Sequence, residues 1–192
     1  MPGNDFTNQF LIAMPGMVDE NFAGSVVYLC EHNDKGALGL VINKPIDITL
    51  KNLFEKVELP LDRDELARQP VLFGGPVQTE RGFVLHEGHA PDEESGYSST
   101  LNIPGGLAMT TSKDVLEAVA DGAGPKKLLI TLGCSGWEPG QLEDEIAANG
   151  WLTCPVNDPD LLFNPDVETL YDKVLASMGI NPVHLSDVAG HA

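Results

Sequence analysis

Short apolar runs separated by glycine and proline fill most of the first half of the chain and predict β-strands. The turn-forming residues at 33–36 separate two of these runs, so a hairpin is expected there. Apolar residues then recur at helical spacing from Leu50 to Val57, after capping oxygens of Asp47 and Thr49, which predicts an amphipathic helix. The predicted strands span residues 10–14, 25–30, 37–42, 71–73, 82–86, 97–103, 107–110, 127–132 and 151–156.

Helical patterns lie between the later strands. Residues 111–114 have the character of a capping box, with aspartate in place of the usual glutamate, and the helix that follows would end at Gly122. A second helix is expected over about 139–149, and the charged segment 58–70 is expected to form a loop or one short helix. Many strands followed by two strand and helix alternations predict an α+β fold with a mixed sheet.

The last predicted helix has the most regular pattern. Asn164 can cap it, Pro165 would occupy its first position, and an apolar stripe extends to Met178. Because acidic residues occupy other positions of this helix, docking onto the body of the protein is favoured over binding to a membrane surface. We therefore expect one domain over residues 1–181, followed by a loose tail at 182–192.

The chain is strongly acidic, with 29 Asp and Glu against 11 Lys and Arg and a formal net charge of −18. Binding to nucleic acid requires clustered bases that neutralise phosphates, so direct binding of DNA or RNA is disfavoured. The same charge opposes an anionic membrane and favours a monomer or small oligomer. The sequence has no long apolar stretch and no secretory signal pattern, and its three cysteines cannot all pair with one another, so we expect a cytoplasmic protein.

A glycine-rich segment after the strand at 127–132 is a candidate for chemistry. There Gly133-Cys134-Ser135-Gly136 would form a turn between a strand and a helix, where backbone N–H groups can stabilise a thiolate. The spacing differs from the G-x-S-x-G nucleophile elbow, and no arginine follows at the distance typical of phosphatases. A packed, inert thiol is therefore favoured over a nucleophile.

Metal and nucleotide sites find little support in the sequence. Neither Cys30-Glu31-His32 nor His86-Glu87-Gly88-His89 has the ligand spacing of a zinc site. We therefore expect no metal and no cofactor. Glycine clusters that match no phosphate-binding loop are interpreted as turns, at 74–76, 105–106 and 122–125.

Several short motifs follow one another along the chain: Ala13–Met17, Asp19–His32, Gly39–Pro45, Gly74–Val77, Arg81–His86, Gly136–Trp137 and Gln141–Glu143. In this order they resemble the AlgH/YqgE family of bacterial proteins, from about residue 9 to residue 178. The resemblance implies an α+β fold with a bifurcated, largely antiparallel sheet that includes a small closed barrel, flanked by helices. It also implies a description as a transcriptional regulator, with no established ligand, cofactor or catalytic residue.

One departure from the family pattern concerns the candidate thiol. Where we expect the family to carry Gly-Tyr-Ala-Gly-Trp, this chain has Cys134 and Ser135 between the glycines. The resemblance therefore lowers the case for Cys134 as a nucleophile. We expect some of the residues that match the family pattern to line one cleft for a small polar or anionic ligand or a partner protein: Asn43, Lys44, Arg81, His86, Trp137, Gln141 and Glu143.

The sequence thus predicts a non-enzymatic binding or regulatory protein, in which any effect on transcription is indirect because the charge opposes DNA. Two alternatives stay open. One is a small hydrolase or transferase using Cys134 or His86. The other is a structural or assembly module that binds a partner through the apolar stripe of the last helix or through an uncovered strand edge.

Overall fold

The computed structural model describes residues 5–14, 22–87, 99–103, 106–122, 125, 127–156, 161–163 and 169–180. Its strands are β1 (Gln9–Ala13), β2 (Val26–Asn33), β3 (Gly36–Val41), β4 (Pro45–Thr49), β5 (Pro70–Phe73), β6 (Val77–Glu87), β7 (Thr100–Ile103), β8 (Leu107–Thr110), β9 (Leu128–Trp137) and β10 (Trp151–Pro155). Its helices are α1 (Leu50–Lys56), α2 (Asp64–Ala67), α3 (Asp114–Ala120), α4 (Gln141–Ala147) and α5 (Leu170–Ser177). The predicted α+β class is confirmed.

The strands form one curled, mostly antiparallel sheet in the order β10-β1-β2-β3-β9-β6-β8-β7. Strand β9 is where the sheet divides. It pairs with β6 along most of its length, while β5 runs parallel to its middle and β3 runs antiparallel to its end. The predicted closed barrel is not found, because the pairing of the described strands is open and its outermost members, β7 and β10, do not pair with each other.

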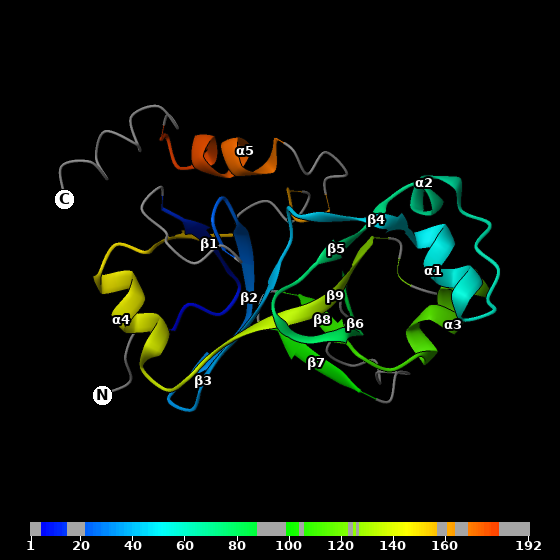
Figure 1. The fold of residues 1–192 in the computed structure, drawn as a ribbon, viewed down its shortest axis with the longest axis horizontal. Coiled ribbons are helices and arrows are strands. Elements are labelled where there is room, and N and C mark those ends of the chain that lie inside the picture. Colours follow the sequence, from blue (N-terminus) through cyan, green and yellow to red (C-terminus); the bar gives the residue numbers. More distant parts are fainter. Residues whose placement is uncertain are drawn as a thin grey trace.

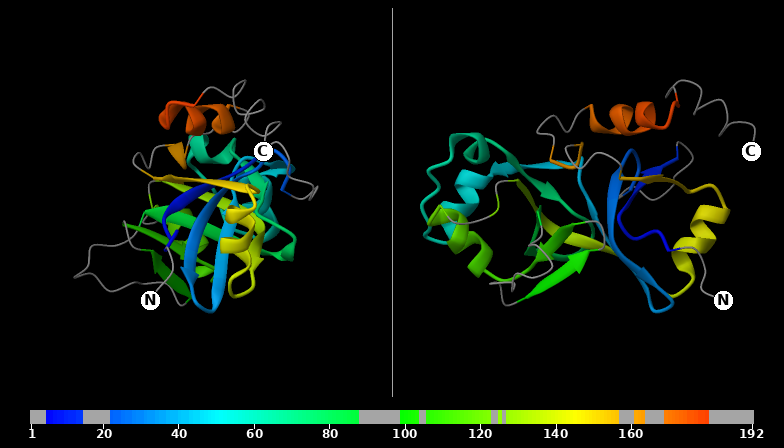
Figure 2. Two further views of the ribbon diagram at one scale, coloured as in Figure 1. Left: turned by 90° about the vertical axis from the view of Figure 1, so that its left-hand side faces the viewer. Right: turned by 180° about the vertical axis from the view of Figure 1, so that it is seen from behind.

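The helices gather at different ends of this sheet (Figure 1). Helices α1, α2 and α3 lie at one end, where they cover a core built from both helix and strand residues, including Phe54, Val115 and Ile130. Helix α4 lies at the other end, beside β1 to β3. The view from behind shows the same separation, with α5 lying across the top of the molecule (Figure 2). The core between α1, α3 and the sheet is the part that forms the pocket described below.

The glycine-rich segment after Leu132 continues strand β9, so the predicted turn at this point is wrong. Cys134 pairs with Val77 of β6, and the next residues of β9 pair with β3. Gly133 has a φ of +80°, and a Cβ atom there would overlap the carbonyl oxygen of Gly75. The left-handed glycine therefore lets the strand bend past Gly75 without ending it.

Two predicted helix starts have different outcomes. The side chain of Thr49 accepts a hydrogen bond from the backbone of Asn52, which confirms the expected cap of α1. The capping box expected at 111–114 is wrong, because α3 begins after Lys113 with no side-chain cap and the Ser112 hydroxyl donates to Asp114 instead. Strand β4 was not predicted, and the short helix allowed for in 58–70 is α2.

The apolar side of α5 is already covered by the protein itself. Leu170, Val174 and Leu175 are buried in the largest core, and the Tyr171 hydroxyl donates to the carbonyl of Ala13 at 2.6 Å. The predicted cap and first turn of this helix, and the tail at 182–192, lie outside the described residues.

Candidate functional site

Cys134, the candidate nucleophile, is enclosed in the interior of the sheet. Cys134 is 3% exposed and belongs to the same apolar core as the buried residues of α5. Burial raises the pKa of the thiol, and the Arg81 guanidinium offsets part of that effect. A buried thiol with a raised pKa is neither accessible to a substrate nor ionised near neutral pH, so its environment is that of an inert core residue.

His86 is also fully enclosed, at 0% exposure. Its Nδ1 lies 2.7 Å from the carbonyl oxygen of Glu87, which can only accept, so Nδ1 carries a hydrogen. Its Nε2 lies 2.8 Å from the Thr110 hydroxyl, which is 2.9 Å from that of Thr100. This chain of polar groups joins β6, β8 and β7, and it leaves His86 without a surface that a ligand could contact.

Asn43 and Lys44 lie where the chain leaves β3. The Asn43 carboxamide accepts from the backbone N–H of Val26 at 2.9 Å and donates to the carbonyl of Gly24 at 2.9 Å. The Lys44 carbonyl accepts from the backbone N–H of Phe73. Both polar groups of the Asn43 side chain are therefore used to fix the start of β2.

Trp137 and Gln141 meet through a residue that sequence reasoning missed, Glu145. One carboxylate oxygen of Glu145 accepts the indole N–H groups of Trp137, at 3.1 Å, and of Trp151, at 2.9 Å. The other oxygen accepts from the Gln141 amide at 2.8 Å. Gln141 is one helical turn before Glu145, but nothing in the sequence places the two indoles on that carboxylate. This cluster attaches α4 to the sheet.

Glu143, on the same helix, forms a pair with a buried histidine. Its Oε1 lies 2.9 Å from His32 Nε2, and this hydrogen bond holds the pKa of the Glu143 carboxyl below its ordinary value. The other ring nitrogen of His32 accepts from the backbone N–H of Phe6 at 3.0 Å. His32 therefore joins α4 to the segment before β1.

Arg81 lies on an irregular part of β6. Residues 78–81 stand opposite Gly133 alone in the ladder with β9, which makes a large, irregular bulge. The Arg81 guanidinium donates to the Gln78 carboxamide at 3.3 Å and to the Thr111 hydroxyl at 3.2 Å. These two bonds join the two ends of the bulge and tie it to the end of β8.

The structure therefore brings together only some of the seven predicted site residues. Trp137, Gln141 and Glu143 lie on or beside α4, whereas Arg81 and His86 lie on β6. No hydrogen bond joins the two groups within the described residues. His86 has no exposed surface with which to line an open cleft. The prediction that some of the seven line one cleft therefore cannot include His86, and for the other residues it stays a prediction.

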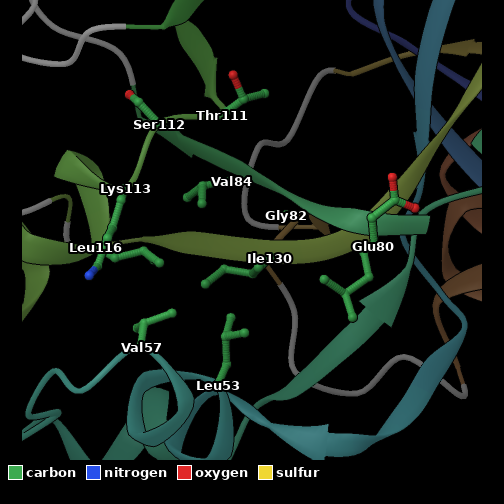
Figure 3. Close-up of a pocket in the computed structure, with 11 residues that line it drawn as sticks. Leu53, Val57, Glu80, Gly82, Val84, Thr111, Ser112, Lys113, Leu116 and Ile130 are labelled. Carbon is green, nitrogen blue, oxygen red and sulfur yellow. The ribbon is translucent and has the colours of Figure 1, made fainter. Parts of the chain in front are cut away.

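A pocket of about 270 Å³ lies elsewhere, between the sheet and the two helices α1 and α3 (Figure 3). Its floor is formed by β6 and β9. Across it, Leu53 of α1 and Val57, which directly follows α1, face Val84 and Ile130. The lining residues are Leu53, Val57, Glu80, Gly82, Val84, Thr111, Ser112, Lys113, Leu116, Ile130 and Leu132. The pocket thus has an apolar interior with polar groups at its border, the composition typical of small-molecule sites.

Gly82 gives this pocket much of its space. It lies inside strand β6, yet its φ is not in the left-handed region, and a Cβ atom placed on it would meet no atom within 4 Å. Neither backbone conformation nor crowding therefore requires glycine here, in contrast to Gly133 and Gly75. Any larger side chain at position 82 would project into the pocket.

Two charged residues border the pocket. Glu80 lies at one end in Figure 3, and Lys113 lies at the opposite end beside Leu116. Both are exposed, and neither forms an ion pair with another described residue.

The sequence predicted the helices that form the pocket's walls, but it did not predict the pocket. Leu53 and Val57 belong to the apolar stripe that predicts α1, and Leu116 belongs to that of α3. The signal that was missed is Gly82, which the sequence prediction made the first residue of a strand at 82–86 and which lies inside the longer strand β6. An isolated glycine inside a strand often marks a close approach or a bulge, and here it marks both a bulge and an opening.

No three His, Cys, Asp or Glu side chains are placed to hold a metal ion in the part of the chain that the structure describes. Among the described helices, none is long and apolar enough to cross a membrane.

Comparison with known proteins identifies relatives over nearly the whole chain. A family model described as AlgH-like matches residues 10–183. A UPF0301 protein of Polaromonas sp. (strain JS666) is 63% identical, and one of Ralstonia nicotianae is 61% identical, each match covering 98% of this chain and 96% of the relative. These matches confirm the resemblance on which the sequence prediction relied.

Two solved structures have a similar fold. The solution structure of AlgH from Pseudomonas aeruginosa is 47% identical, with a TM-score of 0.75 and coverage of 95% of this chain and 94% of that one. The crystal structure of protein DIP2367 from Corynebacterium diphtheriae is 20% identical, with a TM-score of 0.72 and coverage of 97% and 92%. At that identity the second likeness concerns the fold alone.

Proposed function

We propose that this chain, which belongs to the AlgH-like family, is a non-enzymatic binding protein whose site is the pocket between β6, β9, α1 and α3. The observation that supports this proposal is Gly82. A glycine inside a strand costs about 0.5–1 kcal/mol relative to alanine. Since neither its φ nor its neighbours require glycine, the open space that it leaves is the feature that a bound ligand would use.

The ligand that fits this pocket is a small organic molecule with an apolar body. The interior is lined by leucine, valine and isoleucine side chains from four different elements. The pocket has a volume of about 270 Å³, which is enough for several water molecules or a small organic body. Water in such a space finds few polar partners, so an apolar group that displaces it gains free energy.

The enzyme alternative is less well supported. Its two candidate residues, Cys134 and His86, are buried away from the pocket and from solvent. Among the pocket's lining residues, Ser112 and Thr111 bear hydroxyls, but no described histidine lines the pocket to act as their base. Binding without chemistry is therefore the function that the lining favours.

One form of the assembly alternative would use the apolar stripe of α5, and the other would use an uncovered strand edge. The buried residues of that stripe already contact the protein's own core, which leaves this part of the helix without a free apolar face. A role in regulation, if the pocket serves one, would act through the bound molecule, because a net charge of −18 opposes contact with DNA. We place this function in the cytoplasm, where the free thiols of three buried cysteines persist.

Amide chemical shifts during titration with hexan-1-ol test this proposal. The probe has a six-carbon apolar body and no charge. We expect the largest shift changes at Leu53, Val84 and Leu116, which line three different sides of the pocket. Saturable changes at these positions support the proposal. Absence of any saturable change, or changes confined to residues elsewhere, such as those around α4, would contradict it.

A further inference from the structure

The charges around the pocket indicate which apolar molecules it prefers. Glu80 and Lys113 border it at opposite ends. Within the described residues, neither the Glu80 carboxylate nor the Lys113 amine forms an ion pair. A ligand with a charged head can therefore reach a carboxylate at one end of the pocket or an amine at the other. The two charges cancel in sum, so they do not by themselves decide which sign is favoured.

The rest of the chain decides the sign. Without Glu80 and Lys113 the formal net charge is still −18. A surface with this excess of acid has a negative potential, which concentrates cations and repels anions, above all at low salt. Acidic residues also directly follow the pocket's helical lining in the chain: Glu58 follows Val57, and Glu117 follows Leu116. Both are exposed, so they add to the potential outside the pocket.

The pocket offers different surroundings to the apolar body and to the charged head of a cationic ligand. The apolar body would lie over Gly82, between α1 and the floor of the sheet, where no side chain fills the space. Glu80 precedes Gly82 by two residues and lies on the bulge of β6, so a head group that leaves the pocket at this end meets its carboxylate. The bulge thus places an exposed acid beside the opening that the glycine creates.

We infer that the pocket takes amphipathic organic cations, namely small alkyl or arylalkyl amines whose apolar body fills the space over Gly82 and whose ammonium group pairs with Glu80. This inference rests on the proposed function, since it names the ligand class of the same pocket. It differs from the sequence prediction of a polar or anionic ligand, which depended on a cleft containing Arg81 and Lys44.

Three probes with the same six-carbon body test the inference: hexylammonium, hexan-1-ol and hexanoate. Their dissociation constants are measured by amide shift titration at low ionic strength and again in 0.5 M salt, where the Debye length is about 4 Å. We expect hexylammonium to bind about two- to fivefold more tightly than hexan-1-ol, as for an exposed ion pair, and hexanoate to bind most weakly. High salt should bring the three values together.

Two substitutions separate the local carboxylate from the general charge. Glu80→Gln should remove most of the advantage of hexylammonium over hexan-1-ol, each affinity being measured in the same variant. Glu138→Gln removes one negative charge from an exposed position directly after β9 and should keep that advantage. Equal effects of the two substitutions would contradict pairing at Glu80.

The outcomes also distinguish this inference from the function on which it rests. If hexan-1-ol binds but hexylammonium binds no more tightly, or hexanoate binds best, the preference for cations is wrong and the binding function stands. If none of the three probes binds at the pocket, the proposed function fails and the inference fails with it.

Discussion

Gly82 is paired with Leu132 across the ladder of β6 and β9, and both residues line the pocket. Leu132 supplies part of the apolar floor, whereas Gly82 supplies only backbone. The next residue on the same side of β6 is Val84, which also lines the pocket. The floor is therefore apolar on either side of position 82, where no side chain is present. Substitution of Gly82 tests directly why glycine occupies this position.

Substitution of glycine by alanine should distinguish Gly82 from the glycines that the fold requires. Gly82→Ala should leave the free energy of unfolding unchanged or raise it by about 0.5–1 kcal/mol, because the strand conformation and the open space both accept a methyl group. Gly133→Ala should lower it by at least about 1 kcal/mol, because φ is +80° and the new Cβ would overlap the Gly75 carbonyl. Urea denaturation measures both. A large loss of stability in Gly82→Ala would mean that the fold itself needs this glycine.

The Glu145 carboxylate should be important for stability. Glu145→Ala removes the acceptor of the Trp137 and Trp151 indole N–H groups and should lower the free energy of unfolding by about 1–3 kcal/mol. Glu145→Gln keeps one oxygen and should cost less. Because both tryptophans of the chain are in this cluster, their fluorescence reports the change directly. An equal free energy of unfolding for Glu145→Ala and the wild type would contradict the stabilising role of this cluster.

The pair of Glu143 and His32 should make stability depend on pH in the acid range. The hydrogen bond holds the pKa of Glu143 below its ordinary value of 4.5, so its contribution is full above that pH and is lost as pH falls through the lowered pKa. Glu143 is partly exposed, so the contribution is at most about 0.5 kcal/mol after allowance for solvent screening. Glu143→Gln should therefore lower the free energy of unfolding at pH 7 and have little effect at pH 3. An equal difference at both pH values would show that the carboxylate's charge is not involved.

The thiol of Cys134 should be unreactive in the folded protein. Burial raises its pKa, and Cys30 and Cys154 are buried as well. An aromatic disulfide reagent at pH 7.5 should label no cysteine rapidly in the native state and all three after denaturation. Rapid labelling of Cys134 in the native protein, identified by mass spectrometry of peptides, would restore the enzyme alternative.

Much of the fold could be predicted from the sequence because local patterns determined it. The hairpin turn at 33–36 and the stripe of α1 each depend on residues close together in the chain. The path of β9 could not be predicted in this way. Gly133 looks like a turn residue by composition, but the neighbouring strands β3 and β6 extend the ladder through it, and those partners lie far away in sequence.

The candidate site was harder to predict for the same reason. Family resemblance picked out Asn43, Trp137 and Glu143, whose side chains hold elements of the fold together. The pocket instead depends on how far α1 and α3 stand from the sheet, which no local pattern encodes. Only the unexplained glycine at position 82 could have indicated it from the sequence.

The most direct test of the central claim is the affinity of hexan-1-ol for Gly82→Leu relative to the wild type. The leucine side chain should occupy the space above the floor of the pocket without straining the strand, so we predict at least a tenfold weaker affinity, about 1.4 kcal/mol, in a protein that still unfolds cooperatively. Gly136→Leu is the matched control, since it places the same side chain at an open, exposed position of β9 outside the pocket. Unchanged affinity in Gly82→Leu, or equal loss in both variants, would contradict the assignment of this pocket as the binding site.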